Sequence, residues 1–487
     1  ARRFGHAVAA TRLYGAAMTS PAFSLAADAH ASAKLSAWRT EIAETFALAV
    51  PMALTQLGQV AMMTTDLALI GRLGETAVAA AALAHIVLFA TFTAGIGLVS
   101  AVTPLGAQAF GARAPRRVRA ALRVGLWATF IVGVPLTWLQ LQSEDILLAL
   151  GQDPASSQLA GRYLEGLAWS LVPSWVFIAF RGFMGAVNAP GPALWITLAA
   201  IPTNAVLAYA LIHGAFGLPE LGIFGAGLAT TLVAVAMCIA AAVISATCRP
   251  FRKYAVLQEL WRPDWLLMRR LLALGLPISG SSLLEYGVFA AAALLMGQIG
   301  TSALAAHQIA LQIAAVMFMV PLGISLAATV RVGHAIGRDD QLSARRAGFT
   351  AIWLGLLFMA AMTLLVALTR HQIPLLFLGD TGAANETAQI TAALLVVGAS
   401  FFMADGMQVV ANGALRGRND TRIPLLFAAL GFWGIGFPCS YLLGFPGGLG
   451  PSGVWIGLAV GLTVYAVLLV WRFHRLSRDA LTISSRH

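Results

Sequence analysis

Long apolar runs separated by short polar segments dominate the chain. Twelve runs reach about 20 residues, the length that an α-helix needs to cross the apolar core of a bilayer. They lack the residue-by-residue alternation of apolar and polar side chains that is typical of membrane β-barrels. We therefore predict twelve transmembrane helices, over residues 44–70, 78–105, 119–142, 160–182, 191–214, 222–247, 270–297, 302–330, 346–370, 388–413, 422–444 and 450–472.

Composition agrees with an all-α integral membrane protein. Of 487 residues, 59% are hydrophobic and 10% are charged, whereas about 25% of a soluble domain is charged. The formal charge of +11 could indicate nucleic-acid binding, but the basic residues lie in short clusters between apolar runs, so we expect no nucleic-acid partner. The three cysteines are too few and too scattered for a disulfide framework or a metal site.

The basic clusters also predict an orientation. If the N-terminus is cytoplasmic, only Arg72, Arg162 and Arg370 of the 31 Lys and Arg residues fall on the opposite side. The positive-inside rule then places both termini in the cytoplasm, and we expect a multi-pass protein of the bacterial inner membrane. Residues 1–33 are rich in Ala and Ser and lack the apolar region of a secretory signal, so we predict a disordered N-terminal tail.

The chain repeats itself. A shift of 226 residues aligns 51–127 with 277–353 without a gap. The matched pairs include Pro51/Pro277, Gly71/Gly297, Gly74/Gly300, Phe92/Phe318, Gly97/Gly323, Thr103/Thr329, Gly111/Gly337, Arg119/Arg345 and Trp127/Trp353. Because six helices return the chain to its starting side, the two halves are expected to be six-helix lobes related by a pseudo-two-fold axis along the membrane normal, with a binding site near the midplane.

The predicted organisation follows from this repeat. It comprises a cytoplasmic N-terminal tail at 1–40, an N-lobe at 41–248, a cytoplasmic linker at 249–269, a C-lobe at 270–474 and a cytoplasmic C-terminal tail at 475–487.

Three carboxylates fall inside predicted spans: Glu285, Asp405 and Asp66. An ionised group in a bilayer costs several kcal/mol and is by default a functional candidate. We expect no Lys or Arg at the same depth, which disfavours simple ion pairing; burial as neutral acids is the other alternative. Such a carboxylate can bind a proton or Na⁺, and an organic cation would compete for the same charge.

Other residues are weaker candidates for a substrate cavity. Phe289 lies one turn beyond Glu285 and could offer a cation–π surface or simply pack. Gln308, Gln312 and Asn204 could bind a ligand or join helices by hydrogen bonds. A further residue, Gln59, is the counterpart of Glu285 in the repeat, so the two halves differ in charge at this position.

Four segments resemble one known family. They are 276–338, which contains LPISGSSLLEYGVF, AAHQIA and RVGHAIG, then DGMQVVANGALRGRNDTRIP (405–424), PMALTQLGQVAMMTTDLALIGRLG (51–74) and TPLGAQAFGA (103–112). They resemble the multidrug and toxic compound extrusion (MATE) family, NorM-like branch, over about residues 40–475.

The resemblance implies a twelve-helix antiporter that expels organic cations or drugs in exchange for Na⁺ or H⁺. Glu285, Asp405 and Asp66 match acidic residues that the family uses for coupling and substrate binding, and Na⁺ is a candidate ligand at Glu285 and Asp405. Two departures affect the details: Phe401 stands where relatives can have Tyr, and Gln312 where they often have Asn.

Two alternatives remain open on the sequence alone. A lipid-linked saccharide flippase of the same superfamily would be expected to place several Arg in its cavity, and a non-transporting scaffold would not explain unpaired carboxylates at mid-depth. No GxxxxGK[ST] nucleotide motif is present, so ATP-driven transport is not expected. We expect a secondary transporter rather than an enzyme, a monomer in contact with membrane lipid, and no cofactor besides the coupling ion.

Overall fold

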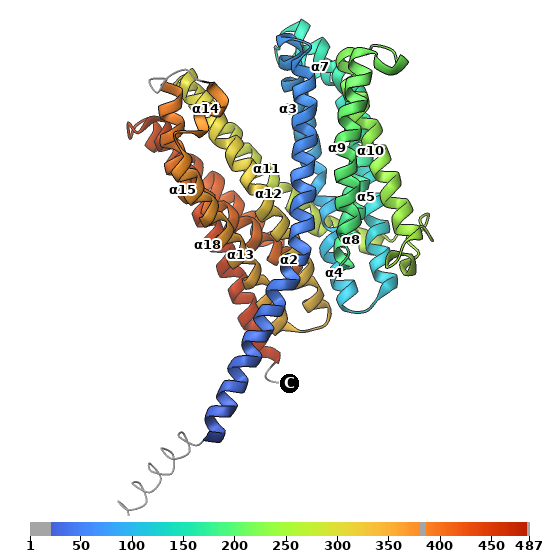
Figure 1. Ribbon diagram of the computed structural model, residues 1–487, viewed down its shortest axis with the longest axis vertical. Coiled ribbons are helices and arrows are strands. Elements are labelled where there is room, and N and C mark those ends of the chain that lie inside the picture. The colour runs from blue at the N-terminus through green and yellow to red at the C-terminus, as the bar shows by residue number, and fades with distance from the viewer. Residues whose placement is uncertain (1–20, 380–385, 485–487) are drawn as a thin grey trace, which may run out of the picture.

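The computed structural model describes residues 21–379 and 386–484 and is built from helices (Figure 1). The first half contains α2 (Pro21–Gly71), α3 (Glu75–Ser100), α4 (Val102–Gly111), α5 (Pro115–Leu141), α6 (Ser143–Ala149), α7 (Pro154–Leu167), η1 (Ala168–Ser170), α8 (Leu171–Ala186), α9 (Gly191–His213), η2 (Ala215–Gly217), α10 (Gly222–Thr247) and η3 (Phe251–Tyr254). The second half contains α11 (Trp265–Ile299), α12 (Thr301–Gly337), α13 (Gln341–Thr369), α14 (Ile373–Leu378), α15 (Glu386–Gly417), α16 (Arg422–Ala428), η4 (Ala429–Gly436), α17 (Phe437–Gly444) and α18 (Gly450–Ser484).

Some of these helices join into longer spans. Within the described residues, twelve helical segments are long and apolar enough to cross a membrane, which confirms the predicted number. The eleventh, Arg422–Gly444, contains a π-helical segment between its two α-helical parts.

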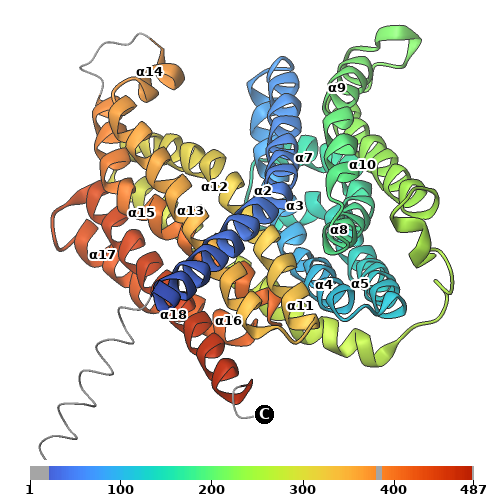
Figure 2. The same cartoon turned by 60° about the horizontal axis from the view of Figure 1, so that its bottom comes forward.

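The two halves form two lobes that meet at one end of the molecule and diverge toward the other (Figures 1 and 2). We call the end at which α2 enters and α18 leaves the basal end, and the opposite end the distal end. Each lobe has its own buried aromatic residues. They include Trp175 and Phe183 in the first lobe and Phe402, Trp455 and Phe473 in the second.

Glycines matched by the repeat form close contacts between the lobes. A Cβ built on Gly97 would lie 2.2 Å from the backbone nitrogen of Ser279, and one on Gly323 would lie 2.5 Å from the Cα of Ala53. Ser279 is the repeat counterpart of Ala53, so the two contacts are the same contact made twice. Small residues let helices approach closely in a membrane, where dispersion forces replace the hydrophobic effect as the main attraction.

The same holds nearer the basal end. A Cβ on Gly111 would lie 2.2 Å from the carbonyl oxygen of His334, and one on Gly337 would lie 2.1 Å from that of Gln108, which is the counterpart of His334. This reciprocity confirms the two-lobed pseudo-symmetric fold that the repeat predicts.

The N-terminal tail differs from the prediction. Residues 1–20 lie outside the described residues, but α2 already begins at Pro21, so residues 21–40 are helical rather than disordered. The Ala-rich stretch 26–33 explains this, because alanine has the highest intrinsic helix propensity. At the other end, α18 continues to Ser484 through most of the predicted C-terminal tail.

Candidate functional site

Two of the three predicted carboxylates meet in the second lobe. Glu285 projects from α11 and Asp405 from α15, and the side-chain amide of Gln408 lies between them. Gln408 Nε2 donates to Glu285 Oε1 at 3.1 Å and to Asp405 Oδ1 at 3.2 Å. Neither carboxylate belongs to an ion pair among the residues that the structure describes. The pair therefore keeps free acceptor oxygens that a cation can use.

A second polar contact continues this site toward the basal end. Asn412 lies one turn beyond Gln408 on α15, and its Nδ2 donates to the hydroxyl of Tyr465 on α18 at 3.1 Å. All of these side chains carry oxygen atoms, and both Na⁺ and protons bind to oxygen.

Aromatic residues stand one helical turn from each carboxylate, Phe289 after Glu285 on α11 and Phe401 before Asp405 on α15. Phe289 is partly buried, and its ring packs edge-to-face against Phe401 with centroids 5.9 Å apart. Phe401 in turn contacts Trp455 at 5.3 Å. Of the two alternatives for Phe289, the structure shows packing, while a role toward a cation stays a prediction.

The two glutamines of α12 lie apart from this cluster. Gln308 and Gln312 are both exposed, and the structure shows no hydrogen bond from either side chain within the described chain. They therefore do not join helices in this state, and their assignment to a cavity stays a prediction.

Asp66 forms a separate site in the first lobe. Its side chain is 6% exposed although it stands only five residues before the end of α2. Asn204 Nδ2 on α9 donates to Asp66 Oδ1, and Thr230 Oγ1 on α10 donates to Oδ2 at 3.0 Å. Asn204 Oδ1 is enclosed and accepts no hydrogen bond among the described residues. An enclosed acceptor without a partner beside a carboxylate suits a small cation, because a bound cation would interact with both oxygen atoms, which burial separates from water.

Gln59, the counterpart of Glu285, faces a positive charge. Arg181 on α8 donates from Nη1 to Gln56 Oε1 and, at 3.3 Å, to Gln59 Oε1. The expectation that no Arg lies at the depth of the carboxylates is therefore wrong for this lobe. In the second lobe, Arg416 near the end of α15 lies close enough for its charge to act on Glu285, although the two do not form an ion pair. The sequence places Arg181 in a cytoplasmic segment because it lies near the end of a predicted span, but α8 continues past it to Ala186 and its side chain reaches back to Gln59.

Comparison with known proteins identifies the family. The model of the MatE family matches residues 51–210 and again residues 277–442. The two matches cover more than half of the chain and begin 226 residues apart, as the repeat does. The chain belongs to the MATE family.

Individual relatives agree with this membership. A probable multidrug resistance protein NorM of Rhodopseudomonas palustris is 75% identical over 465 residues, which cover 96% of this chain and 98% of that protein. The multidrug resistance protein NorM of Burkholderia vietnamiensis is 41% identical over 433 residues, covering 88% and 93%. The family identifies the chain as a membrane transporter and not an enzyme.

Solved MATE structures share the fold at low sequence identity. The transporter AtDTX14 has a TM-score of 0.81 and 22% identity, covering 91% of this chain and 99% of that chain. A mutant of the Vibrio cholerae MATE transporter VcmN has a TM-score of 0.83 and 18% identity, covering 91% and 98%.

The lobes of this MATE chain are joined by hydrogen bonds at the basal end. Arg331 of the second lobe binds Glu41 of the first through two bonds, Nε to Oε1 at 3.0 Å and Nη2 to Oε2 at 2.9 Å, and it also pairs with Glu44. A ring nitrogen of His334 lies 2.7 Å from the carbonyl oxygen of Ala186. Bidentate pairs of this kind are directional as well as strong, so they favour one arrangement of the two lobes.

The pseudo-symmetric position carries matching bonds. Gln108 Nε2 donates to the carbonyl oxygen of Gly417 at 2.9 Å, and Asn419 Nδ2 donates to Gln108 Oε1 at 2.7 Å. Together with the glycine contacts, these bonds hold the basal end closed.

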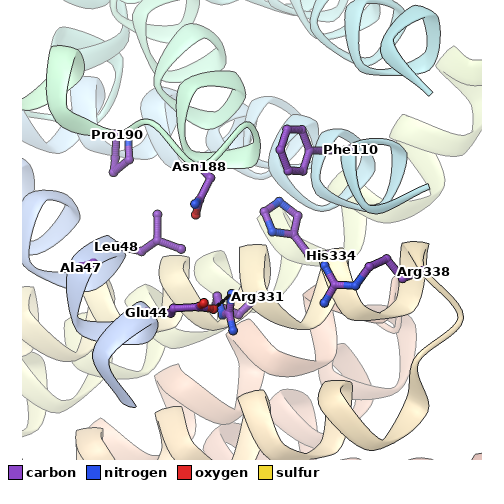
Figure 3. Close-up of a pocket in the computed structure, with 9 residues that line it drawn as sticks. All are labelled: Glu44, Ala47, Leu48, Phe110, Asn188, Pro190, Arg331, His334 and Arg338. Atoms are coloured by element: carbon purple, nitrogen blue, oxygen red, sulfur yellow. Dashed lines mark ion pairs between the residues drawn. The ribbon is translucent and has the colours of Figure 1, made fainter. Parts of the chain in front are cut away.

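A pocket of about 410 Å³ lies beside Arg331 (Figure 3). Glu44, Asn188, His334 and Arg338 are among the residues that line it, so it belongs to the basal seam between the lobes. None of the three carboxylates inside the spans lines this pocket.

Several residues of the candidate sites could not be predicted, or were not predicted, from the sequence. Gln408 follows Asp405 by three residues, so its place on the same helix face was available as a signal. Thr230 offers no such signal, because it meets Asp66 only through the packing of α2 against α10.

Proposed function

We propose that this MATE protein is a cation-coupled antiporter of the inner membrane that exports organic cations by alternating access. The observation that carries the proposal is the pair Glu285 and Asp405, bridged by the neutral amide of Gln408 and not ion-paired within the described chain. The names of the relatives, multidrug resistance proteins, support drugs as substrates.

The coupling follows from competition for one charged site. An inward-moving Na⁺ or H⁺ that binds the carboxylate pair removes the negative charge on which an organic cation depends. A ligand shifts a conformational equilibrium only by its differential affinity for the two states, so an ion and a drug that exclude each other at one site produce exchange. Asp66 with Asn204 and Thr230 supplies a second cation site in the other lobe.

Orientation completes the proposal. With the basal end in the cytoplasm, as the distribution of basic residues favours, the closed seam faces inward and the diverging lobes face outward. The structure then represents the state that releases the drug and receives the ion. The two carboxylates also favour an organic cation over the pyrophosphate of a lipid-linked saccharide.

Transport in proteoliposomes tests this proposal. Ethidium efflux is measured with a Na⁺ gradient and a pH gradient applied separately, in wild type and in Glu285→Gln and Asp405→Asn. We expect one of the two gradients to drive efflux and each substitution to lower the rate at least tenfold. Glu220→Gln, which neutralises an exposed carboxylate in the connection before α10, serves as the matched control and should keep the wild-type rate. Undiminished efflux in both site variants would refute the mechanism.

A further inference from the structure

Arg181 is an intramembrane cation that the coupling mechanism leaves without a role. Its neighbours along the chain are apolar, and its hydrogen-bond partners, Gln56 and Gln59, are neutral. No carboxylate pairs with it among the described residues. An arginine keeps its charge in proteins. A charge within a membrane normally pairs with a group of opposite sign, because leaving it unpaired there costs free energy.

One edge of the guanidinium is free. Both bonds of Arg181 use Nη1, which leaves Nε and Nη2 without a hydrogen bond in the described structure. Neither of these two atoms is among the fully enclosed polar atoms that lack a partner, in contrast to Nε of Arg416. Arg181, Gln56 and Gln59 are all partly exposed. The Nε and Nη2 edge is therefore accessible, and it has the geometry that binds a carboxylate through two parallel hydrogen bonds.

The repeat relates this edge to the carboxylate pair. Gln59 corresponds to Glu285, and it meets the fourth helix of its lobe at Arg181, as Glu285 meets the fourth helix of the other lobe at Gln408. Where these helices meet, the first lobe therefore presents Arg181, and the second presents Glu285 and Asp405. The fourth helix of the second lobe also carries an arginine, Arg416, but its charge acts on Glu285, whereas Arg181 has no carboxylate partner among the described residues. A substrate with one cationic group leaves Arg181 unpaired, whereas a substrate with a cationic and an anionic group complements both lobes.

We propose that Arg181 binds the carboxylate of zwitterionic substrates, while Glu285 and Asp405 bind their ammonium group. Gln56 and Gln59 are positioning residues that hold the guanidinium by Nη1 so that its other edge stays free. The proposal rests on the proposed function for the ammonium end of the substrate. It makes Arg181 a determinant of specificity: it separates amino-acid-like drugs from simple organic cations.

Equilibrium binding to the purified protein tests the proposal independently of transport. The probes are norfloxacin, which carries a carboxylate and a secondary amine, its methyl ester, which keeps the amine alone, and ethidium, which has no carboxylate. Their intrinsic fluorescence gives Kd for wild type, Arg181→Gln, Arg181→Lys and Gln59→Glu.

We expect Arg181→Gln to raise the Kd of norfloxacin about tenfold or more, as loss of a charge-assisted hydrogen bond does, and to change the Kd of the ester and of ethidium less than about twofold. Arg181→Lys keeps the charge but not the paired donors, so its Kd for norfloxacin should be intermediate. Gln59→Glu places a carboxylate beside Arg181 and should weaken the binding of norfloxacin as Arg181→Gln does.

Two results would overturn the proposal. An unchanged Kd for norfloxacin in Arg181→Gln is one, and equal losses for all three probes, the mark of a merely structural role, are the other. If the Arg181 variants do not fold, wild type alone decides, because it must bind norfloxacin at least several-fold more tightly than the ester. Absence of ethidium efflux under both gradients would count against the antiport mechanism. It would not decide the role of Arg181, which the binding measurements test separately.

Discussion

Replacing Gly337 by alanine should open the basal end of the transporter. The added Cβ would lie 2.1 Å from the carbonyl oxygen of Gln108 and 2.9 Å from the backbone nitrogen of Ala112, whereas ordinary contact begins at 3.4 Å. The obstructing atoms are backbone atoms at the end of α4, so no side chain can rotate away and the lobes must separate by more than about 1 Å. Overpacking of this kind costs about 1–3 kcal/mol, which corresponds to a shift of roughly 5- to 150-fold in the ratio of closed to open molecules.

Spin labels across the basal seam measure this shift. Cysteines at the exposed positions Arg116 and Arg478, in a background without Cys238, Cys248 and Cys439, report the separation of the lobes by electron–electron double resonance. We expect a longer-distance population in Gly337→Ala that wild type lacks or populates weakly.

Two variants sharpen the test. Gly111→Ala makes the pseudo-symmetric clash, 2.2 Å from the carbonyl oxygen of His334, and should open the seam to a similar extent. Gly191→Ala adds the same methyl group at the start of α9 where no atom lies within 4 Å, and it should leave the distances unchanged. Wild-type distance distributions in both seam variants would show that these glycine contacts do not set the balance between the two states.

Three further predictions concern other contacts. Asn204→Ala removes a donor to Asp66 and an unpaired acceptor beside it, and should weaken binding of the coupling ion about tenfold, measured by the ion concentration at half-maximal efflux; an unchanged value would separate Asp66 from coupling. Arg331→Gln breaks the bidentate pair at the seam and should increase the open population seen by the same spin labels, as loss of about 1.5–3 kcal/mol of charge-assisted bonding predicts; an unaltered distribution would contradict this. Asp340 caps α13 by accepting from the backbone nitrogen of Ser343 at 2.9 Å. Burial raises the pKa of Asp340, but the hydrogen bonds from Ser343 and the positive charges of Arg338 and Arg346 together outweigh burial and hold the pKa below its usual value. Because folding lowers this pKa, the ionised carboxylate of Asp340 stabilises the fold above the ordinary pKa near 4, and this stabilisation is lost as the pH falls below that value. Thermal unfolding in detergent should therefore show a smaller acid-induced loss of stability in Asp340→Asn than in wild type. Parallel pH profiles of the two proteins would refute the role of the cap.

The helices and their duplication could be predicted from the sequence because both depend on local or repeated patterns. Apolar runs of membrane-spanning length are visible in any single segment, and matched Pro, Phe, Arg and Trp residues exposed the repeat. The contact of Gly111 with His334 and of Gly337 with Gln108 follows once two equivalent halves are placed around one axis.

The site could be predicted only in part. Glu285, Asp405 and Asp66 were selected singly, from the cost of a charge in an apolar run, but their partners depend on which helices pack together. Thr230 reaches Asp66 from a helix more than 160 residues away, and nothing local in the sequence records that approach. Arg181 was misjudged for a physical reason: a long side chain near a helix end can extend into the membrane as well as out of it.

The repeat is kept where the lobes touch and lost at the positions that we propose bind the ion and the substrate. Gly97 and Gly323, like Gly111 and Gly337, make reciprocal contacts, as two equivalent lobes placed around one axis do. The proposed binding positions do not match in this way. If Gln59 were a glutamate like Glu285, it would neutralise Arg181, the arginine that we propose binds the carboxylate of a substrate. The difference between Gln59 and Glu285 therefore leaves Arg181 without a carboxylate partner in the first lobe, and under the proposal above this arrangement favours a substrate that carries both signs.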